Sequence, residues 1–501
     1  MSDEKRQDHP GGERSQGGTP SGDRLYPAIP PRRLPLPGLK NRAGAGGPTA
    51  NAKVVIVGAG FAGLSAARAL RSAPADITII DRHNYHCFQP LLYQVATATL
   101  SPADIAWPIR TLFRDQKNVT VLLATVTGVD VNSKFVFADG RAFPFDYLIL
   151  AAGATHYYFG HPDWEAVAPG LKTIEDGTAI RRTILLGFEK AELAQTEEER
   201  KRFMTFVIVG GGPTGVEMAG AIAAIARGSL QPDFRHINAK EATIMLVEGG
   251  PRILPALPSK LSDYAKRALE RMGVQVETST MVTACTANGV ETAKGFIEAA
   301  TIIWAAGVVA SPAAEWLGVK ADRAGRVEVT EELSLPGLPF VFVAGDVAAV
   351  RGPSGVPVPG IAPAAKQMGN YAGNKIAADL AGKQVKPFRY RHEGDLAVIG
   401  RGAAVVHIGR FSLTGFIGWL FWGAAHIFFL IGVRNRVAVM MSWLWYYVTF
   451  QSGARLITGY DPAAEPSPGC SPHARAGADV DRTQARPVDI SDEQAGHVAQ
   501  R

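Results

Sequence analysis

The chain has few cysteines, and no two of them are neighbours. Cys87, Cys285 and Cys470 are far apart and form no Cys-x-x-Cys pair. This spacing excludes a disulfide scaffold and a dithiol redox centre, gives no indication of a metal site, and fits a reducing compartment. We interpret Cys87 as a small buried hydrophobe.

Strong charge asymmetry is also absent. The formal net charge is only +6, and the Lys and Arg residues are dispersed without a nucleic-acid-binding motif. Nucleic acid is therefore not an expected partner, and the small basic excess favours solubility with some affinity for anionic lipid. Residues 1–50 are rich in Gly, Pro, Ser and charge and contain acids, which argues against a secretory signal and against an acid-poor transit peptide. We expect this extension and the tail at 461–501 to be disordered.

Two glycine-rich turns are the most informative feature that is present. Each follows an apolar run, at residues 54–57 and 206–209, and precedes an alanine-rich helical stretch. In such a Gly-x-Gly-x-x-Gly turn the first glycine permits the bend, the second lets the backbone approach a pyrophosphate, and the third allows close helix packing. The contact residues expected from these turns are Gly58, Gly60, Phe61, Ala62 and Gly63 in the first, and Gly210, Gly212, Pro213, Thr214 and Gly215 in the second. Two bound nucleotides are predicted.

An acidic residue ends the strand that follows each turn. Asp81 ends the run 77–81, and Glu248 ends the run 244–248. A carboxylate at this place accepts hydrogen bonds from a ribose hydroxyl and repels a 2′-phosphate, so the second site is predicted to prefer NAD over NADP. Glu248 is unusually far from its turn, because residues 227–241 look like an insertion.

Three further strand ends are candidates for nucleotide contact. Gly153 and Gly307 each follow an apolar strand, and they are either chain re-entries beside a nucleotide or plain strand ends. Asp346 ends another buried strand. It either accepts hydrogen bonds from a sugar-like chain or caps the next helix.

Four longer stretches together resemble the type II NADH dehydrogenases, the single-subunit NADH:quinone oxidoreductases of the two-dinucleotide flavoprotein superfamily. They are residues 81–97, 210–217, 304–308 and 359–367, and the resemblance covers roughly residues 52–460. It implies FAD bound by the first turn, by Asp81 with its neighbour Arg82, and by Asp346. It also implies NADH bound by the second turn and by Glu248.

The resemblance suggests two catalytic residues. Glu217 matches the family glutamate near the nicotinamide and the quinone, and the alternative is a first-turn acid that complements the helix dipole. Gln367 lies at the quinone-facing end of the family's site. Several family members have a glutamine linked to quinone contact where this chain has Pro363, which is a departure at that end.

The fold class expected from these motifs is α/β, with two Rossmann-like dinucleotide-binding domains for FAD and NAD and a C-terminal membrane-associated helical region. A chain of 501 residues, 47% of them hydrophobic, has room for two or three domains. The expected segments are an extension at 1–50, the FAD-binding domain at 51–168 and 326–400, the NAD-binding domain at 169–325, the membrane-associated region at 401–460 and a tail at 461–501.

A membrane contact is expected near the C-terminus. Residues 415–433 carry no charge and would reach about 28 Å as a helix, and residues 437–450 are rich in Trp and Tyr, which favour the interface. Arginines flank the first stretch on both sides, without the asymmetry of a spanning segment. We predict two helices lying in the membrane surface, with residues 411–458 against lipid. The alternatives are a single span at 415–433 and a soluble core helix or dimer seam.

The expected activity is hydride transfer from NADH to FAD, followed by two-electron reduction of a membrane quinone without proton pumping. The expected place is the cytoplasmic face of the inner membrane, and a second copy of the chain is a candidate partner. The alternatives are a related flavoprotein reductase with another acceptor, such as a sulfide:quinone or ferredoxin-type reductase, and a redox-sensing protein that binds FAD and NAD.

Overall fold

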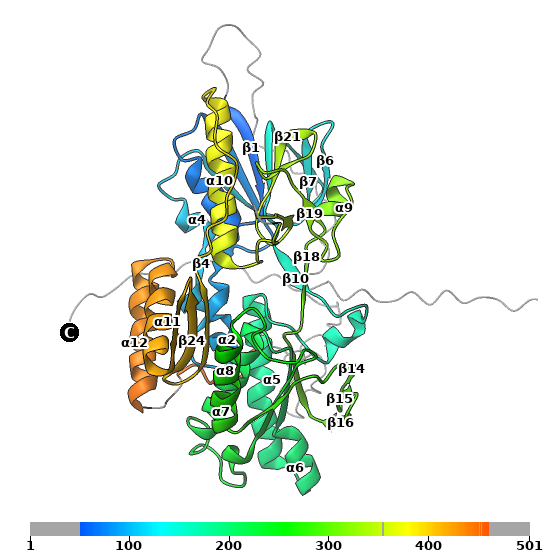
Figure 1. Cartoon of the computed structure of the whole chain (residues 1–501), viewed down its shortest axis with the longest axis vertical. Helices are drawn as coiled ribbons and strands as arrows, with labels where there is room; N and C mark the ends of the chain where they lie inside the picture. Colours follow the sequence, from blue (N-terminus) through cyan, green and yellow to red (C-terminus); the bar gives the residue numbers. More distant parts are fainter. Residues whose placement is uncertain (1–50, 353–354, 450, 452, 460–501) are drawn as a thin grey trace, which may run out of the picture. The chain divides into compact units, whose positions relative to one another are not determined.

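The computed structural model describes residues 51–352, 355–449, 451 and 453–459. The expected extension at 1–50, the tail at 461–501 and Cys470 lie outside the described residues. The described part contains two parallel sheets of the nucleotide-binding type and a C-terminal unit of three strands and two helices (Figure 1). The expected α/β class with two Rossmann-like units is confirmed.

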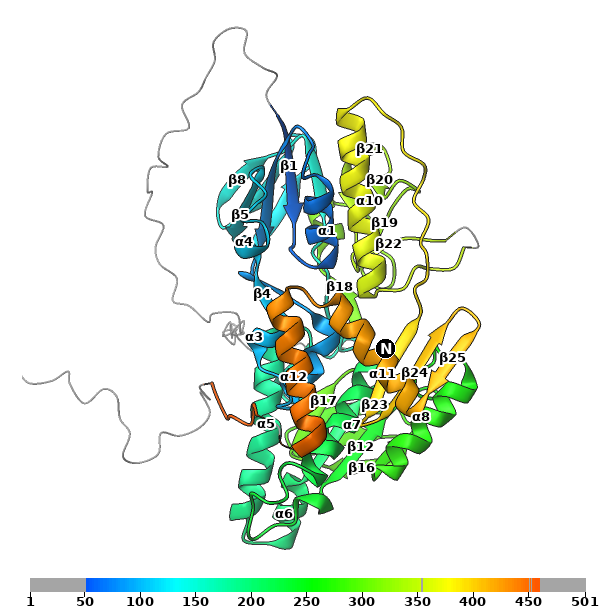
Figure 2. The same ribbon diagram turned by 90° about the vertical axis from the view of Figure 1, so that its left-hand side faces the viewer.

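The first parallel sheet combines segments that are far apart in the sequence. Its order is β20-β21-β9-β1-β2-β5, in which only β20 is antiparallel. The strands are β1 (Ala52–Val57), β2 (Ala75–Asp81), β5 (Val119–Leu123), β9 (Tyr147–Leu150), β20 (Ser334–Leu335) and β21 (Leu338–Val343). Their Val and Ile runs are buried because both faces of the sheet are covered. Helices α1 (Phe61–Ala69) and α10 (Ala362–Leu380) pack against each other beside β1 (Figure 2).

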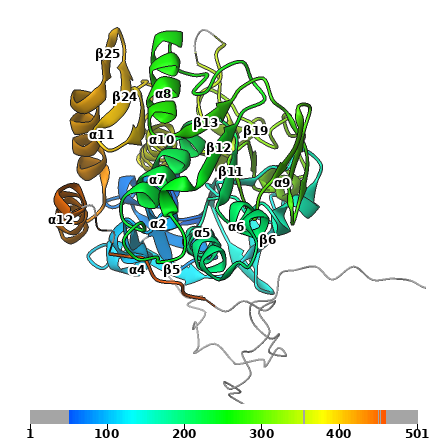
Figure 3. The same ribbon diagram turned by 90° about the horizontal axis from the view of Figure 1, so that it is seen from below.

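The second parallel sheet is formed entirely by the middle of the chain. Its order is β13-β12-β11-β17, and all of its pairs are parallel. The strands are β11 (Thr205–Val209), β12 (Thr243–Val247), β13 (Val274–Glu277) and β17 (Thr301–Trp304). The helices are α5 (Ile174–Leu193), α6 (Glu197–Phe203), α7 (Pro213–Arg227) and α8 (Ser259–Arg271). Figure 3 shows β11, β12 and β13 together with these helices from one end. The insertion expected at 227–241 is a loop that ends in a single 3₁₀ turn, Ala239–Glu241.

Two short strands connect the two sheets. β10 (Ala154–His156) leaves the first sheet and pairs antiparallel with β18 (Val308–Ala310), which leaves the second. The chain then returns to the first sheet through β20 and β21, and Asp346 follows β21. Smaller elements complete this part: β3 (Tyr85–Cys87), β4 (Ala106–Pro108), β6 (Val126–Asp130), β7 (Phe135–Ala138), β8 (Arg141–Pro144), β14 (Val282–Thr286), β15 (Gly289–Thr292), β16 (Gly295–Glu298), β19 (Val327–Glu328), β22 (Ala348–Ala349), α2 (Leu92–Ala96), α3 (Pro102–Ile105), α4 (Ile109–Leu112) and α9 (Ala313–Leu317).

The C-terminal unit is an antiparallel sheet followed by two helices. The strands are β23 (Asp395–Gly400), β24 (Ala403–Ile408) and β25 (Phe411–Thr414), and the helices are α11 (Gly415–Phe429) and α12 (Val433–Thr449). Figure 2 shows α11 and α12 beside each other and close to β24, and β23 packs on α7.

The single helix over 415–433, on which the spanning alternative depended, is not formed. α11 ends at Phe429, because Leu430 has extended backbone angles and Gly432 adopts a φ of +85°. Its 15 residues reach only about 22 Å. Among the described residues no helix combines the length and the apolar character that crossing a membrane requires.

Candidate functional site

The first glycines of the two turns have the same geometry. Gly58 has a φ of +96° and Gly210 a φ of +110°, a region that favours glycine. A Cβ on Gly58 would lie 2.4 Å from the carbonyl oxygen of Ala151, and one on Gly210 would lie 2.6 Å from that of Ala305. Each turn therefore passes directly against the chain that leaves the neighbouring strand.

The other two glycines of each turn also behave alike. A Cβ on Gly63 would lie 1.9 Å from the carbonyl oxygen of Gly58, and one on Gly215 would lie 1.8 Å from that of Gly210. By contrast, no atom lies within 4 Å of a Cβ built on Gly60 or on Gly212. These second glycines border open space at the N-termini of α1 and α7, where backbone N–H groups are free to bind an anion. Both turns thus fit the pyrophosphate of a dinucleotide.

In both sites the acid at the strand end binds its own glycine turn. Asp81 Oδ2 accepts a hydrogen bond from the backbone N–H of Ala59 at 2.6 Å, and Glu248 Oε2 accepts one from Gly211 at 2.5 Å. The other oxygen of each acid accepts from the backbone N–H two residues further along. Carboxylate oxygens have two acceptor positions each, so both acids can still bind a ribose hydroxyl.

Asp346 does not cap a helix. The next helix, α10, begins after Ile361 without a side-chain cap, so the capping alternative is wrong. Within the described part of the chain the Asp346 carboxylate accepts no hydrogen bond, and it lies 3.4 Å from a Cβ position on Gly360. It is therefore available to a ligand at the end of the first sheet.

The glycines at the other two strand ends are fixed by backbone hydrogen bonds. The Gly153 carbonyl accepts from Ser311 N–H at 3.0 Å, and the Gly307 carbonyl accepts from Tyr157 N–H at 3.2 Å. Both glycines lie on the loops that the first glycines of the turns touch, at 151–153 and 305–307.

The remaining predicted contact residues lie at the helix starts and after β2. Phe61 begins α1 and packs edge-on against His86, with ring centroids 4.9 Å apart. Ala62 is buried behind it, Arg82 is exposed, and at the start of α7 Pro213 and Thr214 are exposed. His86 bonds the carbonyl of Ala59 through Nδ1 at 3.0 Å, and burial lowers its pKa to about 4, so a neutral imidazole supports the first turn.

Glu217 is not a first-turn acid. It is the fifth residue of α7, beyond the first turn, so the helix-dipole alternative is wrong. Its side chain lines a cavity of about 70 Å³ between α2, α7, β23 and the C-terminal helices. Removal from water raises the pKa of Glu217 to about 8, although a backbone hydrogen bond from Val398 acts in the opposite direction. The carboxyl group is therefore mostly protonated at neutral pH.

A polar chain that the sequence did not predict leads from this cavity to α12. Trp443 Nε1–H donates to Gln94 Oε1 at 2.7 Å, and Gln94 Nε2–H donates to Tyr93 Oη at 2.7 Å. Burial raises the pKa of Tyr93, and the charge of nearby Glu217 raises it further. The only sequence signal was a polar Gln94 within an otherwise apolar stretch, whose role depends on residues about 350 positions away.

Gln367 is not directed at Glu217. Its amide oxygen accepts from Arg391 N–H at 3.0 Å, and its Nε2 donates to Arg391 O at 2.9 Å and to Glu393 Oε1 at 3.0 Å. The side chain ties α10 to the segment that enters β23. No hydrogen bond between described residues joins Gln367 to Glu217. Pro363 is accommodated in the first turn of α10, where its missing N–H is not needed.

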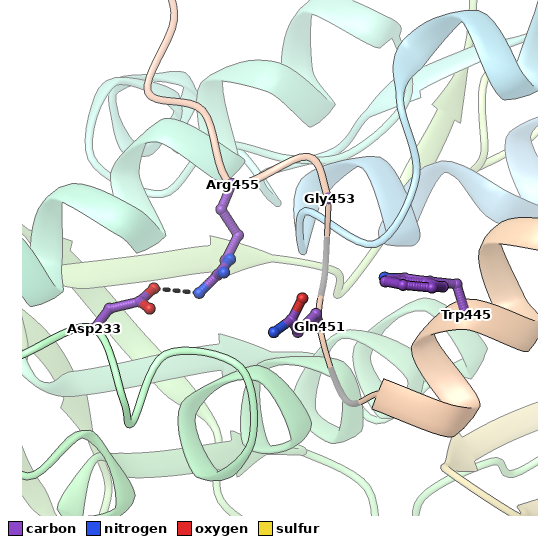
Figure 4. Close-up of a pocket in the computed structure, with 5 residues that line it drawn as sticks. All are labelled: Asp233, Trp445, Gln451, Gly453 and Arg455. Atoms are coloured by element: carbon purple, nitrogen blue, oxygen red, sulfur yellow. Dashed lines mark hydrogen bonds and ion pairs between the residues drawn. The ribbon is translucent and has the colours of Figure 1, made fainter.

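A second, more polar cavity of about 390 Å³ lies near the C-terminal end of α12. Its lining is Asp233, Trp445, Gln451, Gly453 and Arg455 (Figure 4). An ion pair between Arg455 and Asp233 fastens the segment after α12 to the loop that follows α7. None of the predicted site residues lines it.

The two described cysteines do not form a redox pair. Cys87 and Cys285 are both free thiols, and burial raises the pKa of Cys87 to about 12 and that of Cys285 to about 11. Both thiols are therefore protonated at neutral pH and are poor nucleophiles. The described residues also contain no group of His, Cys, Asp or Glu that could hold a metal ion.

The C-terminal helices expose many large apolar side chains, here together called the apolar surface. It consists of Phe416, Ile417, Leu420, Phe421, Phe428, Phe429, Val433, Val437, Met440, Met441, Leu444, Trp445 and Val448. A patch of this kind on a water-soluble face would be unusual.

Two nucleotide cradles on two parallel sheets define a two-dinucleotide oxidoreductase. The model of the pyridine nucleotide-disulphide oxidoreductase family matches residues 52–369. The chain is 42% identical to the type II NADH:quinone oxidoreductase Ndh of Mycobacterium tuberculosis, over 81% of this chain and 90% of that one. It is also 42% identical to NdhA of the same organism, over 78% and 86% of the two chains.

A solved structure of NDH2 from Plasmodium falciparum in complex with NADH has the same fold. The TM-score is 0.74 at 20% identity, and the match covers 82% of this chain and all of that one. The chain belongs to the pyridine nucleotide-disulphide oxidoreductase family and, within it, to the type II NADH:quinone oxidoreductases.

Proposed function

We propose that the chain oxidises NADH at the second cradle and reduces a membrane quinone by way of FAD held at the first. The observation that carries this proposal is the pair of turns with closely similar geometry, each with its second glycine open to a ligand and each with an acid at the next strand end. When bound, FAD supplies the acceptance of a hydride and the release of two electrons. The protein contributes orientation and electrostatics.

The first cradle holds FAD through the N-terminus of α1, Asp81 and Asp346. Asp346 supports this role because its carboxylate has no hydrogen bond within the described residues. The second cradle holds NADH through the N-terminus of α7 and Glu248. Glu248 opposes a 2′-phosphate by like charge, so NADH is preferred over NADPH.

Glu217 holds a proton beside the cavity that adjoins the C-terminal helices. Quinone reduction consumes two protons, and a carboxyl group whose pKa is about 8 can donate one at neutral pH. Tyr93, whose pKa the nearby Glu217 raises, is joined through Gln94 to Trp443 of α12 by hydrogen bonds. Gln367 contributes by holding the segment before β23 in place. β23 contains Val398, whose backbone forms a hydrogen bond with Glu217.

The apolar surface of α11 and α12 rests on the bilayer and lets a lipid-dissolved quinone reach the site. Each large apolar side chain removed from water contributes about 1.5–3 kcal/mol, so a few of them suffice for stable adsorption. Two short helices lying at the interface satisfy their own backbone hydrogen bonds. We place the protein on the cytoplasmic face of the inner membrane, where NADH arrives from water, and we retain a second copy of the chain as a candidate partner.

Two glycine substitutions test whether the cradles have separate roles. Gly60→Val should abolish FAD content, because the side chain would fill the space in which the pyrophosphate lies. Gly212→Val should retain FAD but lose its reduction by NADH. The measurements are flavin absorbance of the purified variants and NADH oxidation with a short-chain ubiquinone. Loss of FAD in the Gly212→Val variant, with Gly60→Val unaffected, would contradict the assignment.

A further inference from the structure

An exposed aromatic pair lies against Gly307, on the loop 305–307 that the second nucleotide turn touches. Tyr157 and Phe159 follow β10, their side chains are 38% and 55% exposed, and their ring centroids are 4.7 Å apart. Val308, the first residue of β18, is 51% exposed. Large apolar side chains are mostly buried in folded proteins, so three exposed together at one place mark a surface that something covers.

The protein holds Phe159 in a costly conformation. Its φ of +52° places a non-glycine residue in the left-handed region, which costs roughly 1 kcal/mol or more. The ring lies edge-on to Trp304, with centroids 6.2 Å apart, and its tip lies 3.1 Å from a Cβ position on Gly307. A substitution at Gly307 would therefore displace the Phe159 ring.

Two hydrogen bonds fix the neighbouring Tyr157 to the end of β17. Its N–H donates to the Gly307 carbonyl at 3.2 Å, and its own carbonyl accepts from Trp304 Nε1–H at 3.0 Å. The aromatic pair is thus anchored on the second nucleotide sheet, although it comes from the strand that leaves the first one.

The anchoring point belongs to the edge at which a dinucleotide binds. Gly307 lies two residues after Ala305, which touches Gly210 of the second turn. Ligands of parallel sheets lie outside the carboxyl ends of the strands. β10 and β18 pair with each other between the two sheets. We therefore expect the half of a dinucleotide that extends from the second turn toward the first cradle to pass along these strands.

We propose that Tyr157 and Phe159 form an aromatic wall against the nicotinamide half of the dinucleotide at the second cradle. The wall presents flat apolar surface to the nicotinamide ring and keeps water from it. This inference rests on the proposed function only in naming NADH as the ligand of that cradle.

The test compares two ligands that differ by the nicotinamide ring. NAD⁺ and ADP-ribose are titrated separately into the FAD-loaded protein, and binding is followed by tryptophan fluorescence. Phe159→Ala is expected to raise the Kd of NAD⁺ about tenfold and to leave the Kd of ADP-ribose within twofold, since a ring stacked on the nicotinamide contributes on that order. The KM for NADH should rise in parallel, with an unchanged KM for quinone.

Two further variants make the result specific. Phe159→Leu keeps apolar bulk and should give a Kd for NAD⁺ between those of the wild type and Phe159→Ala. This variant also keeps the proposal testable if Phe159→Ala does not fold. Phe296→Ala removes a ring of similar exposure, 53%, from β16 and should change neither Kd.

Two results would contradict the proposed contact between the aromatic wall and the nicotinamide half. The first is an NAD⁺ affinity within twofold of wild type in both Phe159 variants, and the second is an equal loss for NAD⁺ and ADP-ribose, which would mean that the ring only supports the turn. Failure of the proposed function is a separate outcome, because NAD⁺ binding can be normal in a protein that does not pass electrons from NADH to quinone.

Discussion

Replacing Glu217 by Gln should make the protein more stable at alkaline pH. The glutamine keeps the shape of the side chain and an oxygen that can accept from Val398, but it cannot ionise. Burial raises the pKa of Glu217 from 4.5 to about 8. At 1.36 kcal/mol per pKa unit, ionising this group in the folded protein costs on the order of 3–5 kcal/mol.

The sign follows from proton binding. Between pH 4.5 and about 8 the folded wild type keeps the proton that the unfolded chain has released, so its stability falls as pH rises. Below this window Glu217 is neutral in both states and carries no penalty, and above it the penalty is complete. The Gln variant lacks this slope, so the variant-minus-wild-type stability rises across the window.

Thermal unfolding followed by tryptophan fluorescence at pH 5 and pH 9 measures the difference. We expect the unfolding midpoint of the variant relative to wild type to rise by roughly 5 °C or more between these pH values. Glu291→Gln, at an exposed position of β15, removes the same charge from water and should show no such change. An offset between Glu217→Gln and wild type that is equal at both pH values would refute the raised pKa of Glu217.

Three other predictions concern packing, cofactor choice and the membrane. Gly220→Ala should destabilise the protein by about 2–3 kcal/mol in denaturant unfolding, because the new Cβ would lie 1.7 Å from the Ile399 carbonyl oxygen. Gly128→Ala is the control, since no atom lies within 4 Å of a Cβ at that position. Equal loss of stability in both variants would contradict the packing of α7 on β23. Glu248→Gln should raise the ratio of kcat/KM for NADPH to that for NADH at least tenfold in steady-state assays, and an unchanged ratio would remove Glu248 from the ribose site. Ile417→Glu should lower binding to anionic liposomes at least tenfold in sedimentation assays. Leu193→Glu, at a similarly exposed position of α5, should leave this binding unchanged. Equal binding of both variants would place the membrane contact elsewhere.

The nucleotide cradles could be predicted because their chemistry is local. A Gly-x-Gly-x-x-Gly turn between a strand and a helix can adopt few backbone conformations, and Gly58 and Gly210 adopt the positive φ that the pattern requires. The positions of the two acids could be predicted for the same reason, since each acid ends the strand that follows its turn. That Asp81 and Glu248 bind their own turns was not visible in the sequence, because it depends on how adjacent strands are aligned.

The surroundings of Glu217 could not be predicted in the same way. Local reasoning considered only the helix dipole, whereas the pKa of Glu217 is set by β23 and by the C-terminal helices, about 180 residues later in the chain. Gln367 shows the same limitation, because its partners Arg391 and Glu393 lie in a connection without a motif.

The end of α11 illustrates a different difficulty. Two helices form, as predicted, but the first is shorter than the uncharged run of 19 residues. The run itself does not show that α11 ends at Phe429 or that Gly432, with its positive φ, separates it from α12. The aromatic pair at Tyr157 and Phe159 gave no periodic signal, since its position depends on the pairing of β10 with β18.

The central claim is that electrons pass from NADH to quinone through one flavin. Stopped-flow absorbance near 450 nm on the detergent-purified protein tests it most directly, with anaerobic NADH in the first mix and a short-chain ubiquinone in the second. The account predicts rapid bleaching by NADH, much slower bleaching by NADPH, and full recovery of the absorbance when ubiquinone is added. Bleaching that ubiquinone does not reverse would contradict the account and would favour a redox sensor or a reductase with another acceptor.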